Sequence, residues 1–300
     1  MTATINVNGT ISDAQHAVVP VLDHGFLYGE GVYETLRTYN QQPFLFDRHL
    51  RRLRTSASMI ALPMPLTDAQ FAERIDDTTK EARRASGSTV PEWYVRILLT
   101  RGVGELTYDP AACPFPSIVI ITKPQVDPPA EAFEKGVRVT LASTIRNHPE
   151  SVNPLIKSNN LLNNALAMQE AFRRGAFEAI MRNYRGELSE CTTANLFVVK
   201  DGAVLTPPLS SGLLAGITRE FLFEIGRDEG VSVRETILRD EDLYTAGEAF
   251  LTSTTRELVP IVQVDQRLIS SGKPGPITKS LLQAFRRRAQ ALTQFAGRRV

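Results

Sequence analysis

The sequence predicts a two-domain α/β protein of the α+β kind, with helices and strands on both sides of a proline-rich linker. The chain has 300 residues, and three of its prolines fall within the stretch 123–129. A single domain commonly spans about 100–200 residues, and proline is excluded from the interior of regular helices and sheets. We therefore predict a small N-terminal domain over 1–122, a linker over 123–132 and a larger C-terminal domain over 133–300.

The composition is that of an ordinary water-soluble enzyme. Hydrophobic residues make up 42% of the chain and charged residues 22%, and 34 basic against 33 acidic side chains leave a net charge of +1. This balance gives no electrostatic reason to expect nucleic acid or an anionic membrane as a partner. Two distant cysteines and four histidines predict neither a disulfide framework nor a metal site. Without a signal-peptide or membrane-span pattern, we expect a cytoplasmic protein.

The N-terminal elements begin with a hairpin. Strands over 4–7 and 10–11 flank Asn8-Gly9, a dipeptide suited to a tight turn. Residues 32–39 alternate and are rich in β-forming residues, and we expect Gln42-Pro43 to break this pattern before 44–46.

Two helices and two strands follow in the N-terminal half. The first helix is expected from about Asp47, which is a suitable N-cap, and the second over 68–85. Strands are predicted over 93–100 and 117–122. The apolar residues of the first helix stand at helical spacing: Leu50, Leu53, Ala57 and Ile60.

Beyond the linker, short apolar strands alternate with helices. Two buried helical faces are predicted from apolar residues that recur at three- and four-residue intervals. The members of the first face are Leu161, Ala165, Met168 and Phe172. The members of the second, near the C-terminus, are Ile277, Leu281, Phe285, Ala289 and Leu292.

The common sequence motifs of phosphate binding and nucleophilic catalysis are absent. There is no G-x-G-x-x-G after a strand, no G-x-x-x-x-G-K-[ST] and no G-x-S-x-G. Candidate residues are therefore dispersed. Lys157 follows apolar Leu155 and Ile156, and a helix is expected to open over 158–160. Such an apolar setting favours the neutral amine of a lysine nucleophile, although an isolated lysine is more often a surface residue.

Several further segments are suited to anions. On the first helix Arg52 shares a flank with His49 and Ser56, while Arg51 points away, and a guanidinium on an inner flank favours a phosphate ligand. A glycine turn places Ile217 and Thr218 in the first turn of a helix, where free N–H groups attract phosphate. Residues 252–256 form a hydroxyl-rich turn after a strand, and Glu190 precedes an apolar strand. Solvated turns and a surface glutamate are the alternatives.

Taken in this order, the segments resemble the class IV aminotransferases, which are pyridoxal 5′-phosphate (PLP) enzymes of fold type IV. That family includes branched-chain aminotransferases, D-amino-acid transaminases and aminodeoxychorismate lyases. The resemblance runs from HGFLYGEGVYE at 24–34 to FLTSTTRE at 250–257. It implies a D-amino-acid aminotransferase-like fold and PLP as cofactor.

The resemblance also implies roles for individual residues. Lys157 resembles the catalytic lysine that carries PLP as a Schiff base and moves the proton at the substrate Cα. Glu190 resembles the acid that pairs with the pyridine nitrogen, and Arg52 resembles the phosphate-binding arginine. The remaining implied cofactor contacts are Leu214 on the ring face and Ile217, Thr218, Ser253 and Thr254 around the phosphate.

The substrate site is implied in the same way. Tyr94 and Arg96 resemble the Y-x-R pair with which branched-chain aminotransferases orient the substrate carboxylate. Tyr33 would line the pocket. The amides of Thr254 and Thr255 would complete the carboxylate site, and Tyr28 and Tyr108 would act across the interface of a homodimer or larger homo-oligomer, with the active site at the domain junction.

Two departures keep the substrate class open. D-amino-acid transaminases have R-x-H where this chain has Leu106-Thr107-Tyr108, which favours branched-chain L-amino acids with a 2-oxo acid such as 2-oxoglutarate as acceptor. Branched-chain aminotransferases usually have a tyrosine five residues after the lysine, where this chain has Leu162. A D-amino-acid or (R)-amine transaminase, an aminodeoxychorismate lyase and a non-catalytic binding protein remain alternatives. Gly102 and Gly104 suggest a lid over 102–110.

Overall fold

The computed structural model describes residues 3–87 and 90–294, and the chain divides into two compact units. The first unit consists of the chain up to Val126, the segment Ile156–Asn160 and the chain from Gln290 onward. The second unit consists of Asp127–Leu155 and Leu161–Ala289. The segment that carries Lys157 thus belongs to the first unit, although it lies far along the sequence.

The first unit contains a six-stranded antiparallel sheet with the strand order β2-β1-β6-β5-β3-β4. Its strands are β1 (Thr4–Val7), β2 (Thr10–Asp13), β3 (Gly31–Tyr39), β4 (Gln42–Pro43), β5 (Trp93–Thr100) and β6 (Ser117–Pro124). The predicted turn at Asn8-Gly9 is confirmed, since both residues have positive φ angles, 51° and 99°.

Two predictions about these strands are corrected. Gln42 and Pro43 do not break the strand pattern but pair with the end of β3 as β4. The reversal is made instead by Asn40 and Gln41, with φ angles of 49° and 62°. The prolines also predict irregular structure over 123–129, yet β6 continues to Pro124, the terminal residue of the strand, where the missing N–H interrupts no interior ladder.

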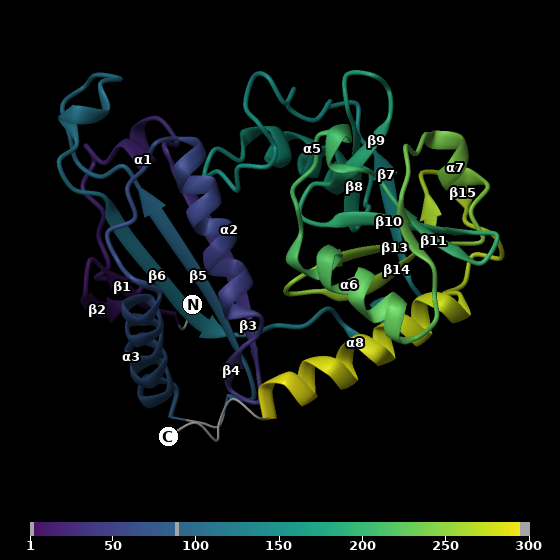
Figure 1. The fold of residues 1–300 in the computed structure, drawn as a ribbon, viewed down its shortest axis with the longest axis horizontal. Helices are drawn as coiled ribbons and strands as arrows, with labels where there is room; N and C mark the ends of the chain where they lie inside the picture. Colours follow the sequence, from purple (N-terminus) through teal and green to yellow (C-terminus); the bar gives the residue numbers. More distant parts are fainter. Residues whose placement is uncertain (1–2, 88–89, 295–300) are drawn as a thin grey trace. The chain divides into compact units, whose positions relative to one another are not determined.

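Among the described residues, three helices lie entirely within the first unit: α1 (His24–Leu27), α2 (Phe46–Met59) and α3 (Asp68–Ser86). Both α2 and α3 pack on one face of the sheet (Figure 1), where Leu50, Leu53 and Phe71 are buried against Leu36 and Ile97. A single 3₁₀ turn, η1 (Pro110–Ala112), lies in the loop between β5 and β6.

The expected N-cap of α2 is wrong. The cap residue is Leu45, which has a φ of 51° and makes no side-chain cap. Asp47 lies inside the first turn, where its carboxylate still faces the positive end of the helix dipole. It also lies 3.5 Å from Arg51, one turn further along the helix.

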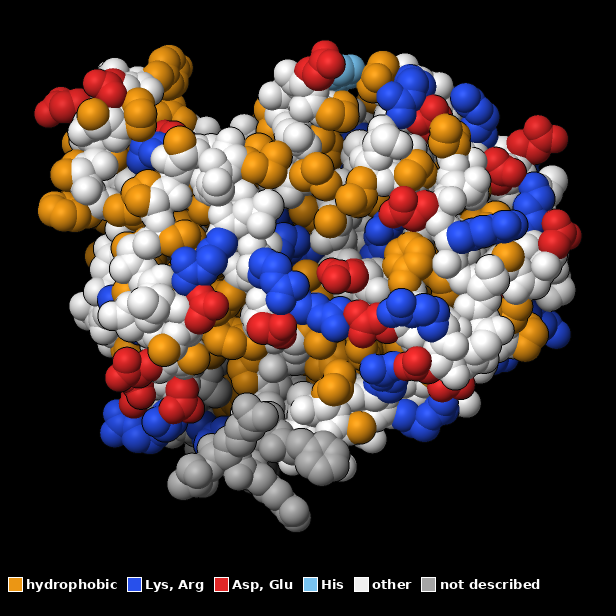
Figure 2. Space-filling model, in the orientation of Figure 1, with side chains coloured by type: hydrophobic (Ala, Val, Ile, Leu, Met, Phe, Trp, Pro, Cys, Tyr) orange, Lys and Arg blue, Asp and Glu red, His pale blue; other side chains and the backbone are white. Residues whose placement is uncertain are grey.

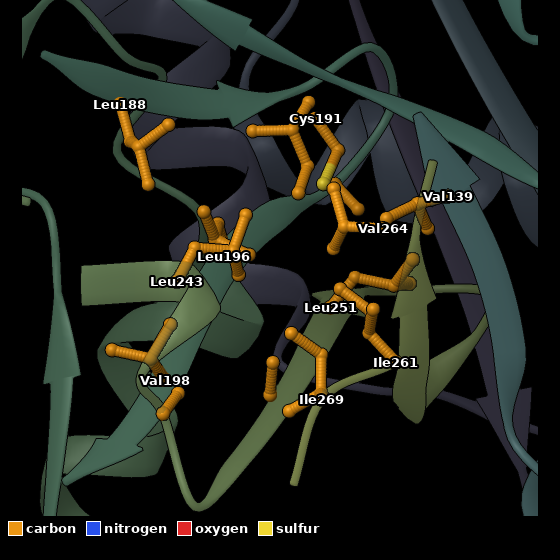
Figure 3. Close-up of a cluster of buried hydrophobic side chains, with 14 of the residues drawn as sticks. Val139, Leu188, Cys191, Leu196, Val198, Leu243, Leu251, Ile261, Val264 and Ile269 are labelled. Atoms are coloured by element: carbon orange, nitrogen blue, oxygen red, sulfur yellow. The ribbon is translucent and has the colours of Figure 1, made fainter. Parts of the chain in front are cut away.

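The second unit is built on a nine-stranded mixed sheet with the order β12-β11-β10-β13-β14-β7-β8-β9, and β15 pairs with β14. Its strands are β7 (Val137–Leu141), β8 (Glu178–Arg182), β9 (Leu188–Cys191), β10 (Asn195–Lys200), β11 (Ala203–Thr206), β12 (Val233–Glu235), β13 (Glu248–Ser253), β14 (Glu257–Val264) and β15 (Arg267–Leu268). Figure 3 shows the core of this sheet, where side chains from β9, β10, β13 and β14 meet around Leu196 and Leu251.

The helices of this part of the chain are α4 (Ala130–Glu134), α5 (Leu162–Arg173), α6 (Ile217–Asp228), α7 (Asp240–Tyr244) and α8 (Pro276–Gln294), with a 3₁₀ turn η2 (Leu209–Ser211). In α8 the predicted face is confirmed at Leu281, Phe285 and Ala289, which are buried, but Leu292 is exposed.

The predicted face of α5 is confirmed at Met168, which packs against the core, but is wrong at two other positions. Ala165 and Phe172 are exposed, and the buried residues are Ala167, Glu170 and Ala171. Alanines form the contact because α5 packs closely on β7 and β8, against Ala142 and Ala179 among others. Within residues 3–87 and 90–294, no helix is both long and apolar enough to span a membrane.

Candidate active site

Lys157 lies beside the first sheet, and its backbone is fixed from two sides. The Tyr33 amide donates to the Lys157 carbonyl at 2.9 Å, and the Asn159 amide donates to the Gly31 carbonyl at 2.9 Å. The Lys157 amide donates to Ser56 Oγ of α2 at 3.1 Å. The helix expected over 158–160 begins only at Leu162, so Lys157 sits in an irregular segment held by β3 and α2.

The side chain of Lys157 is half-buried and lies over an aromatic ring. Its Nζ is 4.4 Å from the centroid of the Tyr33 ring, and the Arg96 guanidinium carbon is 4.0 Å from the same centroid. Both distances are within the range of cation–π contacts. The structure therefore brings three of the predicted site residues together around one ring.

Glu34, the residue after Tyr33, points to the opposite face of β3 and is fully buried under α2. Arg52 donates to both its oxygens, from Nε at 2.7 Å and Nη2 at 2.8 Å, and His49 Nδ1 lies 2.7 Å from Oε2. The predicted flank of α2 is confirmed, because His49 and Ser56 are buried while Arg51 is 70% exposed. Sequence analysis missed Glu34 as the partner of Arg52.

This buried cluster has a defined charge state. Burial alone would raise the pKa of the Glu34 carboxyl, but Arg52 and His49 together hold it well below its ordinary value. Burial lowers the pKa of His49, although Glu34 opposes that shift. A carboxylate only accepts hydrogen bonds, so the neutral His49 imidazole carries its proton on Nδ1. Its Nε2 is buried and has no hydrogen-bond partner.

Tyr94 and Arg96 lie on the face of β5 that is turned away from the α2–α3 core, where both are half-buried. The β3–β5 register sets Arg96 opposite Thr35 and Tyr94 opposite Arg37. Lys123 of β6 places its Nζ 4.8 Å from the centroid of the Tyr94 ring. Aromatic rings and cations therefore share this face of the sheet.

Tyr28 and Tyr108 meet at one end of the first unit. Their ring centroids are 5.1 Å apart, and Tyr108 is 87% exposed. The 102–110 loop is tied to α1 because His24 Nε2 lies 2.9 Å from the Glu105 carbonyl. Figure 2 shows hydrophobic side chains gathered over this end of the unit. The exposed apolar residues here include Val18, Val21, Phe26, Leu106, Tyr108 and Phe115.

In the second unit, Glu190 lies in an irregular part of β9. Ile180 of β8 pairs with Cys191, but Arg182 pairs with Leu188, so β9 carries one extra residue. The extra residue lets Leu188 and Cys191 both point into the core (Figure 3), although they are three positions apart. Glu190 directly precedes Cys191, so alternation along the strand turns it to the opposite face of β9.

The Glu190 carboxylate is held from several sides. Arg146 Nε donates to Oε1 at 2.9 Å, while the Leu214 amide at 3.1 Å and Asn195 Nδ2 at 3.4 Å donate to Oε2. Glu190 and Arg146 are 5% and 8% exposed. Sequence analysis missed both Arg146 and Asn195. Arg146 lies 44 positions away in a segment without a motif, and nothing in the sequence links it to Glu190.

The N-terminus of α6 has no side-chain cap. Its cap residue, Gly216, supplies no side-chain hydrogen bond, and Ile217 and Thr218 form the first turn, as predicted. A Cβ at Gly216 would collide with Asn195 Oδ1, so a larger residue at this position would displace the Asn195 side chain. Asn195 Nδ2 also donates to the Leu214 carbonyl at 3.0 Å, which fixes the turn that leads into the helix.

The hydroxyl-rich turn begins later than predicted. Thr252 and Ser253 are the last residues of β13, and the turn itself covers 254–256. Thr252 lies opposite Asn195 in the β10–β13 register, which places this strand end beside the Glu190 group. Thr252 Oγ1 and Ser253 Oγ are buried without a hydrogen-bond partner, which is unusual for hydroxyl groups in a folded protein.

A second buried glutamate joins the two turns. Glu178 is fully buried and accepts from Arg256 Nη1 at 2.8 Å and from Thr193 Oγ1 at 2.7 Å. Thr192 donates to the same carboxylate through its amide at 3.2 Å and through its hydroxyl. Glu178 therefore links the turn after Glu190 to the turn after Ser253. Sequence analysis missed it, because a glutamate at the start of a strand gives no functional signal.

Leu162 is the first residue of α5 and is 66% exposed.

Among the residues that the structure describes, no three or more histidine, cysteine, aspartate or glutamate side chains are grouped as metal ligands. The cysteines Cys113 and Cys191 are both free and buried.

Comparison with known proteins identifies the family. The model of the class IV amino-transferase family matches residues 31–264. A putative branched-chain-amino-acid aminotransferase from Methanocaldococcus jannaschii is 38% identical over 282 residues, which cover 94% of this chain and 95% of the relative. A D-alanine aminotransferase from Bacillus licheniformis is 31% identical over 278 residues, covering 93% of this chain and 94% of that protein.

A solved structure agrees with these matches. The branched-chain amino acid aminotransferase of Thermobaculum terrenum, in its PLP-bound form, superposes with a TM-score of 0.81 at 27% identity, over 96% of this chain and 94% of that one. The expected fold class and family are thereby confirmed. The chain belongs to the class IV aminotransferases and is a PLP-dependent enzyme similar to branched-chain amino acid aminotransferases.

Proposed function

We propose that the protein transfers the amino group of branched-chain L-amino acids to a 2-oxo acid such as 2-oxoglutarate. The observation that carries this proposal is the half-buried face of β5 and β3, on which Tyr94, Arg96 and Tyr33 lie together. The R-x-H of D-amino-acid transaminases is replaced by Leu106-Thr107-Tyr108, which supplies no guanidinium or imidazole for a carboxylate. The identity of 38% to a putative branched-chain aminotransferase supports the same substrate class.

PLP supplies an aldehyde that bonds to amines and a pyridine ring that accepts the electron pair released at the substrate Cα. Lys157 would provide the amine for that bond, and its free amine would move the proton at the substrate Cα. Its fixed backbone and its contact with Tyr33 limit the positions that Nζ samples. Arg52 binds the phosphate, and Glu34 orients its guanidinium from the buried side.

The second unit fits the phosphate and the pyridine nitrogen. The amides of Ile217 and Thr218 at the uncapped start of α6, with the unpartnered Ser253 hydroxyl and Thr254, supply donors to a dianion. Glu190 would pair with the ring nitrogen, and Leu214 would contact the face of the ring. Every role matches the charge or polarity of the group it receives.

The substrate carboxylate is bound by Tyr94, Arg96 and the amides of Thr254 and Thr255. The Arg96 guanidinium lies over the Tyr33 ring, so its position is set before any substrate arrives. A carboxylate is well matched by a guanidinium and a phenol, and the same set accepts both the amino acid and the 2-oxo acid. Tyr33 lines the pocket for the substrate side chain.

A homodimer is part of the proposal. Exposed apolar residues gather around α1 and the 102–110 loop, and monomeric proteins rarely expose large apolar patches. A second copy covering this group would bury Tyr108, and Tyr28 and Tyr108 would then act at the edge of the partner's active site.

A second candidate is a transaminase for D-amino acids or (R)-amines. Leu162 favours it, because it stands where branched-chain aminotransferases usually have a tyrosine. The identity of 31% to a D-alanine aminotransferase points the same way. An aminodeoxychorismate lyase would use the same lysine and would release pyruvate without any 2-oxo acid acceptor.

The visible absorption spectrum separates these candidates. L-Leucine and D-alanine are added to separate samples of the PLP-loaded enzyme in the absence of acceptor. We expect the band of the lysine-bound cofactor to decrease with L-leucine and to persist with D-alanine. The reverse pattern would replace the branched-chain proposal by the D-amino-acid alternative, and release of pyruvate from aminodeoxychorismate would establish the lyase.

A further inference from the structure

We infer that Arg146 is a positioning residue that keeps Glu190 ionised and thereby keeps the proton on the ring nitrogen of the cofactor. This inference rests on the proposed role of Glu190. Arg146 itself is assigned no contact with substrate or cofactor. It acts through the carboxylate that it holds.

The geometry singles out Arg146 among the donors to Glu190. Its Nε is 2.9 Å from Oε1, whereas the amide of Leu214 and the side chain of Asn195 both donate to Oε2. Arg146 therefore brings a positively charged donor to Oε1. With Glu190 5% exposed and Arg146 8% exposed, solvent screens this ion pair weakly.

Hydrogen bonds to α5 and β8 hold the segment that carries Arg146. Arg146 Nη1 lies 3.2 Å from Asn163 Oδ1, while Asn163 Nδ2 donates to the Ile145 carbonyl at 2.8 Å. The Arg146 amide donates to the Arg182 carbonyl of β8 at 2.8 Å. Arg146 is thus held by α5 and by β8 as well as by Glu190, so its position does not depend on a bound cofactor.

Glu170 of α5 fixes the turn that precedes Arg146 in the chain. Its carboxylate accepts from the amides and hydroxyls of both Ser143 and Thr144, at distances from 2.6 to 3.0 Å. Although burial acts to raise it, these four donors lower the pKa of Glu170 to about 2, so these hydrogen bonds stay intact at neutral pH. Glu170 therefore fixes the turn at Ser143 and Thr144, and Asn163 of the same helix fixes Arg146.

The charge of Arg146 decides where the proton between Glu190 and the pyridine nitrogen resides. A proton on the nitrogen leaves a carboxylate beside the guanidinium, and a proton on the glutamate leaves a neutral acid there. The opposite charge favours the carboxylate, so the guanidinium disfavours transfer of the proton from the ring to Glu190. A protonated ring is the stronger electron acceptor for the pair released at Cα.

A purely structural role would predict a different outcome. If Arg146 only filled space or donated a hydrogen bond, a neutral donor of similar reach would replace it without changing the ring nitrogen. Arg146→Gln keeps an amide donor and removes the charge, and Arg146→Lys keeps the charge. A matched control is Arg182→Gln, which removes a guanidinium that pairs with Asp240 through Nε at 2.8 Å in the same unit.

The test is the ¹⁵N NMR shift of the ring nitrogen in enzyme loaded with ¹⁵N-labelled PLP, together with kcat. We expect the protonated-ring resonance in wild type, Arg146→Lys and Arg182→Gln. In Arg146→Gln the resonance should move towards that of the unprotonated ring, and kcat should fall by about 10²-fold, as for loss of one preorganised charge-stabilising group. Circular dichroism and the PLP content of each variant confirm that the protein is folded and loaded.

Two results would separate failure at different levels. An unchanged, protonated ring nitrogen in folded Arg146→Gln would overturn the role of Arg146 while leaving Glu190 in place. An unchanged ring nitrogen in Glu190→Gln as well, or a wild-type ring that is already unprotonated, would overturn the role of Glu190 on which the inference rests. Should Arg146→Gln not fold, a shifted resonance in Arg146→Lys would also count against the inference, because that variant keeps the charge.

Discussion

At the residue scale, Tyr33 and Glu34 show how one strand serves two purposes. Alternation along β3 turns the Tyr33 ring towards Lys157 and Arg96, and it turns Glu34 under α2 to meet Arg52 and His49. Two adjacent residues thus fix Lys157 and Arg52 from opposite faces of the sheet. A shift of register by one residue would exchange the two roles and lose both.

Glu34→Gln is predicted to lower the free energy of unfolding and to make that free energy depend less on pH in the acidic range. The substitution leaves Arg52 without its carboxylate partner, and breaking a buried ion pair costs roughly 3 kcal/mol. The pKa of Glu34 is depressed in the folded state, so its contribution to the free energy of unfolding is present above the ordinary value of 4.5 and is lost as pH falls below it.

Urea unfolding at pH 7 and at pH 4 measures both effects. We expect the variant to lose less stability than wild type between these two pH values. Asp47→Asn, at an exposed site on the same helix, is the matched control and should behave like wild type. If Glu34→Gln and wild type lost the same free energy of unfolding between pH 7 and pH 4, the Glu34–Arg52–His49 cluster would not determine how stability depends on pH.

The limits of sequence analysis are also clearest at this scale. Lys157, Glu190 and Arg52 stand in segments that resemble family motifs, so the sequence leads to them as candidate site residues. Arg146 and Glu178 cannot be predicted in this way, because their partners lie in distant parts of the chain and no local pattern encodes such a pairing. Their contacts arise from strand pairing in the second unit, which brings β8 and β9 together.

At the element scale, local chemistry determines which predictions hold. The Asn8-Gly9 hairpin and the bounds of β5 follow from turn residues and β-formers, and both are confirmed. The N-cap of α2 and part of the face of α5 are wrong for a different reason. Leu45 adopts a left-handed backbone conformation, which a leucine side chain gives no reason to expect. Helix α5 packs on its sheet through alanines, which contribute little to a hydrophobic sequence pattern.

The start of α6 leads to a prediction about cofactor affinity. Gly216→Ala introduces a Cβ that collides with Asn195 Oδ1, which displaces both the helix start and a donor to Glu190. A favourable helix N-terminus contributes up to about 2 kcal/mol to anion binding, and about 1.4 kcal/mol corresponds to tenfold in affinity. We therefore expect the Kd of the apoenzyme for PLP to rise by about tenfold or more.

Titration of the apoenzyme with PLP, followed by absorbance, gives this Kd. Gly247→Ala is a suitable control, because a Cβ there would meet only the Val199 carbonyl at an ordinary 3.6 Å. Equal affinities for Gly216→Ala and wild type would mean that the start of α6 does not hold the phosphate.

At the scale of the whole molecule, the exposed apolar group around α1 and the 102–110 loop predicts the oligomeric state. Leu106 is 71% exposed and Phe115 79% exposed, although both are large and apolar. Leu106→Asp places a charge in this group and should convert a homodimer into a monomer with reduced turnover, since Tyr108 would no longer reach a partner's active site.

Sedimentation velocity combined with turnover measures this effect. Ile237→Asp, at a residue that is 53% exposed in the second unit, controls for the added charge and should remain dimeric and active. A wild-type protein that sediments as a fully active monomer would contradict the assignment of Tyr28 and Tyr108 to a shared site.

The division of the molecule illustrates what sequence cannot show. Lys157 lies well beyond the predicted linker, yet the segment 156–160 joins the first unit because it pairs with β3. The order of residues in the sequence does not show that a later segment packs back against the first unit. The placement nevertheless explains why a lysine from the middle of the sequence lies beside Tyr33 and Ser56.

The central claim is that Lys157 is the residue that binds PLP, and covalent trapping tests it most directly. Borohydride reduction of the PLP-loaded enzyme fixes the bond between cofactor and lysine, and mass spectrometry of the digested protein locates the modified residue. We predict a single phosphopyridoxyl group on the peptide that contains Lys157, with Lys123, the lysine beside Tyr94, unmodified. A label on Lys123 or on another lysine, or the absence of any label in cofactor-saturated protein, would contradict this assignment.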